Sequence, residues 1–413
     1  MSGIIKKNNK TVVIGGGAAG MLAAIFSAQK GNSVVLIEKN EKLGKKIYIT
    51  GKGRCNLTND CSVEFFLENV VRNSVFLKSC LYSFSPEKTM NFFEENGLKL
   101  KVERGNRVFP LSDKASDITF TLEKLLKKLN VNILLNTIVK EILVENNSIK
   151  GVLTNNSNIQ CDSVVIATGG KSYPLTGSTG DGYKFAKKLG HKIVDIVPSL
   201  TGINLISTEN IALQGLSLKN VVLTATYNDK VVFSQMGEML FAHFGISGPL
   251  VLSCSAIINR LDLSKVSLKI DFKPALSLEK LENRLIRDFS ENNKKNISSV
   301  IKGLLPSKLV EIFISRIKEI KNKNCSEITT KDRDKIVFLL KNFSLKIQSL
   351  RNIEEAIVTS GGVSVNEINP RTMESKIIKN LFFAGEVIDV DCFTGGFNLQ
   401  TAFSTGFMAG NNC

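Results

Sequence analysis

The chain has 413 residues, which is more than one ordinary core holds and predicts two or three domains. A hydrophobic fraction of 43% with 22% charged residues is typical of a globular protein and excludes a disordered chain or a collagen-like fibre. The eight cysteines form no CxxC pair and no Cys/His cluster, which argues against a disulfide scaffold, a metal site and a thioredoxin-type dithiol. With no export signal, we expect reduced thiols and a cytoplasmic location.

The formal net charge of +16 admits a nucleic-acid or anionic-membrane partner. Lysine, however, far outnumbers arginine, and lysine and asparagine are spread along the whole chain, a bias typical of genome composition. No arginine-rich arm with interleaved aromatic residues is present, so we expect neither a nucleic-acid nor a membrane partner.

A dinucleotide fingerprint lies near the start of the chain. Thr11–Ile14 predicts a buried parallel strand, and the glycines of Gly15-x-Gly17-x-x-Gly20 follow it directly, opening a helix. The next apolar run ends at Glu38, where a carboxylate can bind the adenosine ribose. Because the glycines interrupt the almost uncharged run Thr11–Ala28, we expect a strand, turn and helix there and not a membrane span.

Later segments favour FAD over NAD as the nucleotide. Val164–Gly170 is a second buried strand that ends in an Ala-Thr-Gly turn, with Gly169 beside the cofactor. Near the C-terminus, Leu381–Glu386 predicts a strand ending in Ala-Gly-Glu, and an apolar helix follows Gly395 and Gly396. A Rossmann dehydrogenase lacks this returning strand and helix, and no second GxGxxG unit for a built-in NAD(P)H domain is present.

Six motifs give the chain a resemblance to a known family. It resembles the bacterial flavoprotein family that includes aminoacetone oxidases and 3-dehydro-bile-acid reductases, over nearly its whole length. The motifs are Gly51–Asn59, Arg107–Asp117, Gly237–Pro249, Thr359–Val363, Met373–Lys376 and Phe383–Val387 continuing through Asn398–Gln400.

The resemblance implies an α/β, Rossmann-like FAD-binding domain of the two-dinucleotide-binding flavoprotein type, with an inserted β-barrel-like domain and a small helical domain. It implies a set of FAD contacts, which together with the fingerprint residues Gly17, Gly20 and Gly169 are the cofactor site we predict. The implied contacts are Gly15, Ala19, Glu38, Lys39, Lys45, Asn56, Val139, Asp389, Asn398 and Leu399.

The predicted FAD-binding domain is discontinuous. Its first part spans residues 1–190 and its second part spans residues 356–413. Between them, β-like runs predict the barrel-like domain over 191–274, and Lys/Glu-rich runs with helical period predict the helical domain over 275–343. Residues 344–355 are expected to return through the β domain.

Few side chains are candidates for acid–base chemistry. His243 lies in a family motif and is a weak candidate for a substrate-side group, whereas His191 follows a predicted helix and is expected to be a surface or capping residue. Cys55 is expected to be a small packing residue and not a redox thiol. Arg54, Arg104 and Arg107 either hold an anionic group of substrate or NAD(P)H, or form a solvated face.

These features predict an FAD-dependent oxidoreductase that transfers a hydride at flavin N5 to or from a small molecule. Two versions stay open: an NAD(P)H-linked reductase of an enone, with NADH or NADPH as a transient co-substrate, and an oxygen-dependent amine oxidase of aminoacetone type. The alternatives are a flavoprotein acting on tRNA and a non-catalytic FAD-binding module. The sequence does not decide the oligomeric state.

Overall fold

The computed structural model describes residues 9–207 and 209–413 of the chain. They form two compact units, the first made of residues 9–199 with Ile353–Cys413 and the second of Leu200–Asn352. Strand β11 (Ile193–Ser199) follows the predicted boundary at residue 190, and it pairs antiparallel with β19 (Val358–Val363) inside the first unit. The division of the second unit into a barrel-like and a helical domain stays a prediction.

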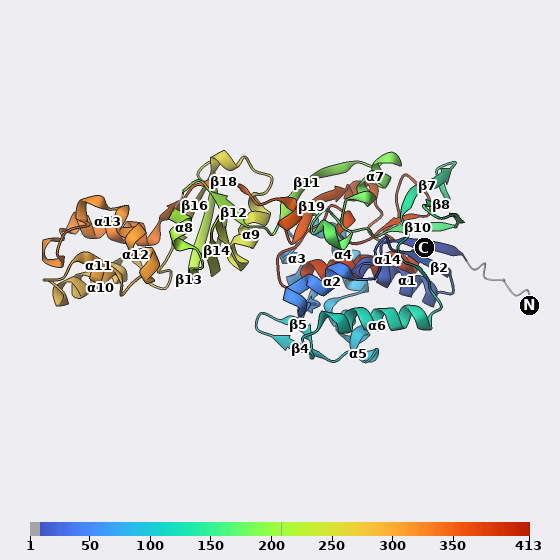
Figure 1. Cartoon of the computed structure of the whole chain (residues 1–413), viewed down its shortest axis with the longest axis horizontal. Helices are drawn as coiled ribbons and strands as arrows, with labels where there is room; N and C mark the ends of the chain where they lie inside the picture. The colour runs from blue at the N-terminus through green and yellow to red at the C-terminus, as the bar shows by residue number, and fades with distance from the viewer. Residues whose placement is uncertain (1–8, 208) are drawn as a thin grey trace, which may run out of the picture. The chain divides into compact units, whose positions relative to one another are not determined.

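A five-stranded parallel sheet forms the centre of the first unit (Figure 1). All four neighbouring pairs in the order β20-β10-β1-β2-β6 are parallel, as expected for a Rossmann-type domain. Val12 and Val164–Ile166 are fully buried, which explains why their strands are almost continuously apolar. The strands are β1 (Lys10–Ile14), β2 (Ser33–Ile37), β6 (Asn132–Leu134), β10 (Ser163–Ile166) and β20 (Leu381–Phe383).

Two helices from opposite ends of the chain pack against each other beside this sheet (Figure 1). They are α1 (Ala18–Gln29) and α14 (Phe397–Asn412). A Cβ atom at Gly406 would lie 2.3 Å from the carbonyl oxygen of Ala19, so only glycine permits this close crossing. The C-terminal segment is therefore part of the same core as the N-terminal fingerprint.

Further elements surround this core in the first unit. The short helix η8 (Gly385–Val387) follows β20, and η2 (Pro174–Thr176) lies between β10 and α7. Two three-stranded sheets have the orders β3-β5-β4 and β7-β8-β9. The other helices and strands are α2 (Lys45–Ile49), β3 (Thr58–Asn59), α3 (Val63–Glu68), α4 (Ser74–Ser83), α5 (Pro86–Glu95), β4 (Leu100–Glu103), β5 (Arg107–Pro110), α6 (Ala115–Lys128), β7 (Val139–Glu145), β8 (Ser148–Thr154), β9 (Asn158–Gln160) and α7 (Asp181–Lys188).

The described part of the second unit contains an antiparallel sheet and six α-helices, four of them in its later part. The sheet has the order β17-β16-β13-β14-β15-β12-β18. β17 and β18 occupy its two ends although Lys346 alone separates them in the chain, so the sheet must curl until its edges approach. The strands are β12 (Ile203–Leu205), β13 (Ser217–Tyr227), β14 (Lys230–Ala242), β15 (Gly245–Ser247), β16 (Val266–Asp271), β17 (Phe343–Leu345) and β18 (Ile347–Leu350).

Three helices of the second unit, α10, α11 and α13, begin at polar side-chain caps. Ser277 caps α10 by accepting a hydrogen bond from the Lys280 N–H, and Thr329 with Asp332 forms a capping box at α13. The helices are α8 (Glu209–Leu213), α9 (Pro249–Ile258), α10 (Leu278–Glu291), α11 (Ile297–Ile301), α12 (Ser307–Ser315) and α13 (Thr330–Lys341). The apolar faces of these helices pack with the sheet in one buried hydrophobic cluster.

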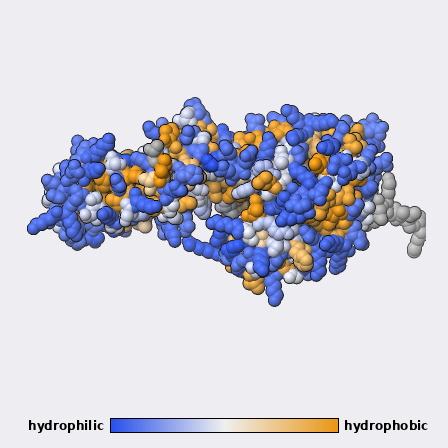
Figure 2. All heavy atoms as spheres, viewed as in Figure 1, coloured by the Kyte–Doolittle hydropathy of each residue, from blue (hydrophilic) through white to orange (hydrophobic). Residues whose placement is uncertain are grey.

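Hydrophilic side chains dominate the face seen in Figure 2, with apolar ones between them. None of the helices in the described part of the chain combines the length and the apolar composition that a bilayer crossing requires. The eight cysteines all have free thiols.

Candidate active site

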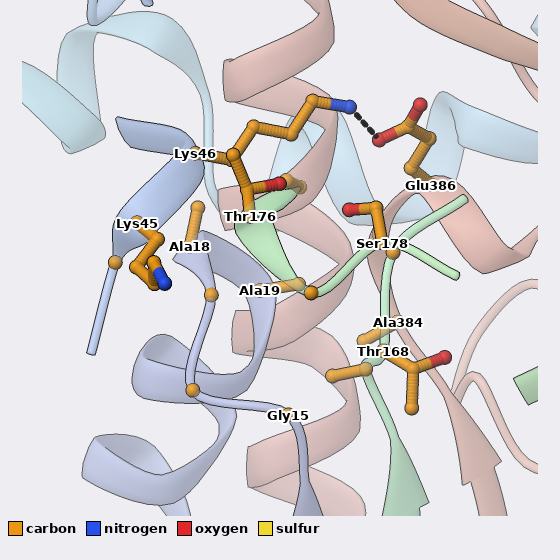
Figure 3. A pocket seen from close by; sticks show the side chains of 18 of the residues that line it. Gly15, Ala18, Ala19, Lys45, Lys46, Thr168, Thr176, Ser178, Ala384 and Glu386 are labelled. Atoms are coloured by element: carbon orange, nitrogen blue, oxygen red, sulfur yellow. Dashed lines mark hydrogen bonds and ion pairs between the residues drawn. The ribbon is translucent and has the colours of Figure 1, made fainter. Parts of the chain in front are cut away.

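A cavity of about 230 Å³ lies in the first unit, at the carboxyl ends of its parallel strands (Figure 3). Its lining includes residues that directly follow four neighbouring strands of the sheet. They are the glycine turn after β1, Glu38 after β2, Ala167–Gly169 after β10 and Ala384–Glu386 after β20. Open α/β sheets bind their ligands at this edge, where the strand ends leave a crevice. The cavity is therefore the candidate active site.

The glycine fingerprint forms one wall of this cavity, and each glycine has a different role. Gly15 has a φ of +105°, and a Cβ there would lie 2.5 Å from the Ala167 carbonyl oxygen. A Cβ at Gly20 would lie 1.9 Å from the Gly15 oxygen, so this residue lets helix and strand pack and does not line the cavity. A Cβ at Gly17 meets nothing within 4 Å, so it would project into open space.

The free backbone N–H groups at the N-terminus of α1 lie at the same cavity. Gly17 is the N-cap of α1 and offers no side chain to bind the free N–H groups of the first turn. Ala18 and Ala19 of that turn line the cavity (Figure 3). A helix start of this kind attracts anionic groups such as a pyrophosphate.

The Glu38 carboxylate is buried, and it braces the glycine turn. Its Oε2 accepts a hydrogen bond of 2.7 Å from the Gly16 N–H, and its Oε1 accepts from the backbone N–H and the side-chain amide of Asn40, at 2.8 and 2.7 Å. Glu38 also lines the cavity. The side chain thus supports the loop that would hold the cofactor and also faces the cavity.

The predicted contacts Lys39, Lys45, Val139 and Gly169 all line the cavity. Lys39 Nζ forms an ion pair with Asp181 at 2.8 Å, whereas Lys45 Nζ forms a longer one of 3.3 Å with Glu41. Gly169 has a φ of +74°, so its left-handed conformation favours glycine.

The start of α14 forms another wall, through Asn398 and Leu399. Gly396 is the N-cap, with a φ of +100°, so the helix begins without a side-chain cap. The Asn398 side chain is occupied by the preceding turn: its Oδ1 accepts from the Cys392 N–H at 2.9 Å and its Nδ2 donates to the Cys392 oxygen at 2.8 Å. The free backbone N–H groups of this first turn, and not the Asn398 amide, are the donors left for a ligand.

Two predicted contacts, Asn56 and Asp389, do not line the cavity. The Asn56 Oδ1 is buried without a hydrogen-bond partner among the described residues. The Asp389 carboxylate is bound by Arg72, at 3.2 and 3.3 Å, and by the Asn73 amide at 3.1 Å. These contacts occupy both oxygens of Asp389 in the structure.

Several lining residues were not among the predicted contacts. They include Thr168, the segment Thr176–Ser178, and an ion pair between Lys46 and Glu386 that Figure 3 shows at the cavity wall. The Ala-Gly-Glu ending of the β20 segment was the available signal for Glu386. The glycine-rich run around Gly177 follows no apolar strand, so its sequence carries no signal for a nucleotide contact.

The two histidines have different surroundings. The prediction of a surface position for His191 is wrong: the chain turns back at Gly190, and the ring is buried against Phe383 with a centroid distance of 5.0 Å. Its Nε2 lies 2.7 Å from the Ser375 Oγ, and burial lowers the pKa of this imidazole. His243 lies beside Phe244 in the second unit, so it is not one of the cavity-lining residues.

The loop motif Gly51–Asn59 is held by charge pairs. The Arg54 Nε donates to the Asp113 Oδ1 at 2.8 Å, its guanidinium also pairs with Glu103, and it lies 4.3 Å from the centre of the Phe109 ring. Arg54 is thus neutralised within the protein, whereas Arg104 and Arg107 are exposed. Cys55 is fully buried, as predicted, and burial raises the pKa of its thiol, which makes it unreactive.

The cavity residues fit FAD. Gly17 leaves open space beside the α1 N-terminus where a pyrophosphate needs close backbone approach. Thr168 also lines the cavity, whereas its Oγ1 is buried beside Gly182 without a partner among the described residues. Glu38 and Val139 are lining residues suited to adenosine, and the N-terminus of α14 forms another part of the lining.

Residues 9–412 match the HI0933-like protein Rossmann domain family. The chain belongs to this family. It is 29% identical to the 3-dehydro-bile acid delta(4,6)-reductase of Clostridium scindens, over 95% of this chain and 96% of that protein. It is 30% identical to the ribosomal RNA dihydrouridine synthase of Haemophilus influenzae, over 94% of each chain. With such relatives, the chain is an FAD-dependent oxidoreductase, as the sequence predicted.

The fold also resembles solved flavoprotein structures. The open conformation of a flavocytochrome c3 fumarate reductase aligns with a TM-score of 0.53 and 19% identity, covering 98% of this chain and 78% of the other. The 3-ketosteroid-delta4-(5alpha)-dehydrogenase of Rhodococcus jostii aligns with a TM-score of 0.52 and 14% identity, covering 99% and 98%. At these identities the likeness concerns the fold alone.

Proposed function

We propose that this protein is an FAD-dependent reductase that adds hydrogen across a carbon–carbon double bond conjugated to a carbonyl group. The observation that carries the proposal is the cavity at the strand ends, whose glycine turn, Glu38 and two uncapped helix starts suit FAD. Two relatives that match almost end to end have names that imply such chemistry. A delta(4,6)-reductase saturates a conjugated ring, and a dihydrouridine synthase saturates the double bond of uracil.

The residues of this chain would position the cofactor and tune its charge. When bound, FAD supplies the hydride at its N5 atom. The α1 N-terminus and the glycine turn would hold the pyrophosphate, and Glu38 would bind the adenosine ribose. The α14 N-terminus would place free N–H groups and about half a positive charge at the flavin end of the cavity. Preorganised dipoles there favour negative charge on the ring without rearrangement.

An anaerobic half-reaction tests this function. Purified yellow protein would be mixed with NADH or NADPH, and the loss of flavin absorbance would identify the electron donor. The reduced protein would then be mixed with a 3-oxo-4-ene bile acid or with unmodified ribosomal RNA. We expect reoxidation by an activated double bond, with two hydrogens gained by the product. Reduction by aminoacetone with reoxidation by dioxygen alone would instead establish the oxidase version.

Ribosomal RNA is the second candidate substrate. The net charge of +16 and the two dihydrouridine synthase relatives, at 30% and 29% identity, favour it over the tRNA that the sequence admitted. Binding to RNA would weaken steeply with added salt, because phosphate contacts release counterions. A salt-independent or absent shift on ribosomal RNA would leave the small enone as the substrate. Either substrate, with NAD(P)H and eight free thiols, fits a cytoplasmic location.

A further inference from the structure

Lys46 and Glu386 form an ion pair on the cavity wall that neither the fingerprint nor the resemblance assigns (Figure 3). The Lys46 Nζ donates to the Glu386 Oε2 at 2.7 Å and also to the Ser172 Oγ. The two side chains are only 25% and 18% exposed, so the pair is shielded from solvent more than an ordinary surface ion pair.

Glu386 is itself held in one orientation. Its Oε1 accepts hydrogen bonds from the Thr359 N–H at 2.8 Å and from the Ser172 Oγ at 3.2 Å. The preceding residue is anchored too, because the Gly385 N–H donates to the Thr405 Oγ1 at 2.9 Å. Glu386 therefore fixes the position of the Lys46 ammonium and not the reverse.

The Lys46 ammonium has a donor left over. A protonated lysine carries three N–H donors, and Ser172 and Glu386 take two of them. The described residues provide no third hydrogen-bond partner for this nitrogen, although its side chain lines the cavity. The remaining donor is thus available to a ligand.

We assign the part of the cavity lined by Lys46 and Glu386 to the flavin ring, because other lining residues suit the rest of FAD. Glu38 and Val139 suit the adenosine, and the turn from Gly15 to Gly17 suits the pyrophosphate. Lys46 and Glu386 are among the remaining lining residues, as are Ile357, Val358 and Leu399, and Figure 3 shows the ion pair well away from Gly15.

We propose that Lys46, held in place by Glu386, contacts the flavin ring and raises the reduction potential of bound FAD. Two-electron reduction with uptake of one proton leaves a negative charge on the ring, and a nearby ammonium stabilises that charge. The inference rests on the proposed FAD-dependent function. The rival explanation is a structural clip between α2 and η8, which would stabilise oxidised and reduced holoenzyme equally.

The test measures the midpoint potential of the purified holoenzyme against a reference dye, without any substrate. Lys46→Met is expected to weaken binding of reduced FAD relative to oxidised FAD about tenfold, which lowers the potential by about 30 mV. Glu386→Gln leaves the ammonium uncompensated and is expected to shift the potential upward. The double variant should lie near the wild type, and Lys46→Arg should retain most of the potential.

Lys42→Met is the matched control. It removes the same charge four residues away, from a side chain that lies over the Tyr48 ring and does not line the cavity. Equal potentials in the Lys46→Met and Lys42→Met proteins, or shifts of the same sign in Lys46→Met and Glu386→Gln, would overturn the proposal. If Lys46→Met purifies without FAD, Glu386→Gln decides alone: a rise supports the proposal, and a fall or no change overturns it.

The potentials do not depend on which substrate is reduced. If the protein reduces no conjugated double bond but the midpoint potentials of Lys46→Met and Glu386→Gln shift in opposite directions, the proposed function is refuted and this inference stands. If the protein is a working reductase but the potentials of the two variants do not shift, the function stands and this inference is refuted.

Discussion

Replacing Glu38 by alanine is expected to weaken FAD binding about 10- to 100-fold while the protein stays folded. The structure gives the carboxylate three hydrogen bonds, to the Gly16 N–H and to both donors of Asn40, so its loss frees the glycine turn. A hydrogen bond to a charged group contributes about 1.5–3 kcal/mol, and about 1.4 kcal/mol corresponds to a factor of ten in affinity. One lost contact of this kind therefore accounts for the expected range.

The assay is titration of the apoprotein with FAD, followed by quenching of flavin fluorescence. Glu41→Ala is the matched control, since that carboxylate is 61% exposed, does not line the cavity and carries the same charge. The 2′-deoxyadenosine analogue of FAD separates the two roles of Glu38. If the carboxylate binds the ribose, the wild type prefers FAD to the analogue and the variant does not. Affinity unchanged within a factor of two in Glu38→Ala would refute the reasoning.

Three further predictions concern other parts of the first unit. Gly17→Val should fold normally, because a Cβ there meets nothing within 4 Å, but should purify largely without FAD; a fully yellow variant with the wild-type melting temperature would contradict this. Leu399→Asp, at the start of α14, should lower the flavin potential and slow reduction, whereas Leu399→Asn should do so much less; equal potentials in both would exclude this helix start from the flavin site. Burial lowers the pKa of His191, so the unfolded state binds more protons and the stability from this group falls as the pH drops below about 6.5. His191→Gln should flatten the melting temperature between pH 7 and 5, and an unaltered slope would show that other groups cause it.

The parts of the fold that local patterns determine were predictable from the sequence. The short apolar runs in Thr11–Ile14 and Val164–Gly170 favoured buried strands by their length, and the structure has strands at Lys10–Ile14 and Ser163–Ile166. The glycine fingerprint then located the turn and helix α1 directly after the first of these strands. Each of these features depends on residues close together in the chain. The curled sheet order of the second unit, with β17 and β18 at opposite ends, depends on pairings between distant strands and has no such local signal.

The buried position of His191 illustrates a second limit. Its neighbours in the chain form a helix end, and helix ends usually lie at the surface. Ser375 and Phe383, nearly 200 residues later in the chain, enclose the ring instead. Arg54 is a similar case, because Glu103 and Asp113 come from the β4–β5 region and pair with it. The local sequence thus predicted the secondary structure around each residue but not the distant residues that its side chain contacts.

Glu386 and Asp389, two of the acidic residues that follow β20, show how partners decide a site. The family resemblance implied Asp389, and not Glu386, as a contact of FAD. In the structure Arg72 and Asn73, more than 300 residues away in the chain, bind Asp389, whereas Glu386 faces the cavity with Lys46. Both oxygens of each carboxylate accept hydrogen bonds, so occupancy does not separate the two acids. They differ in where their partners hold them: Glu386 lines the cavity and Asp389 does not, which makes Glu386 with Lys46 the better candidate. The end of the strand is set locally, but partners distant in the chain determine which side chain lines the cavity.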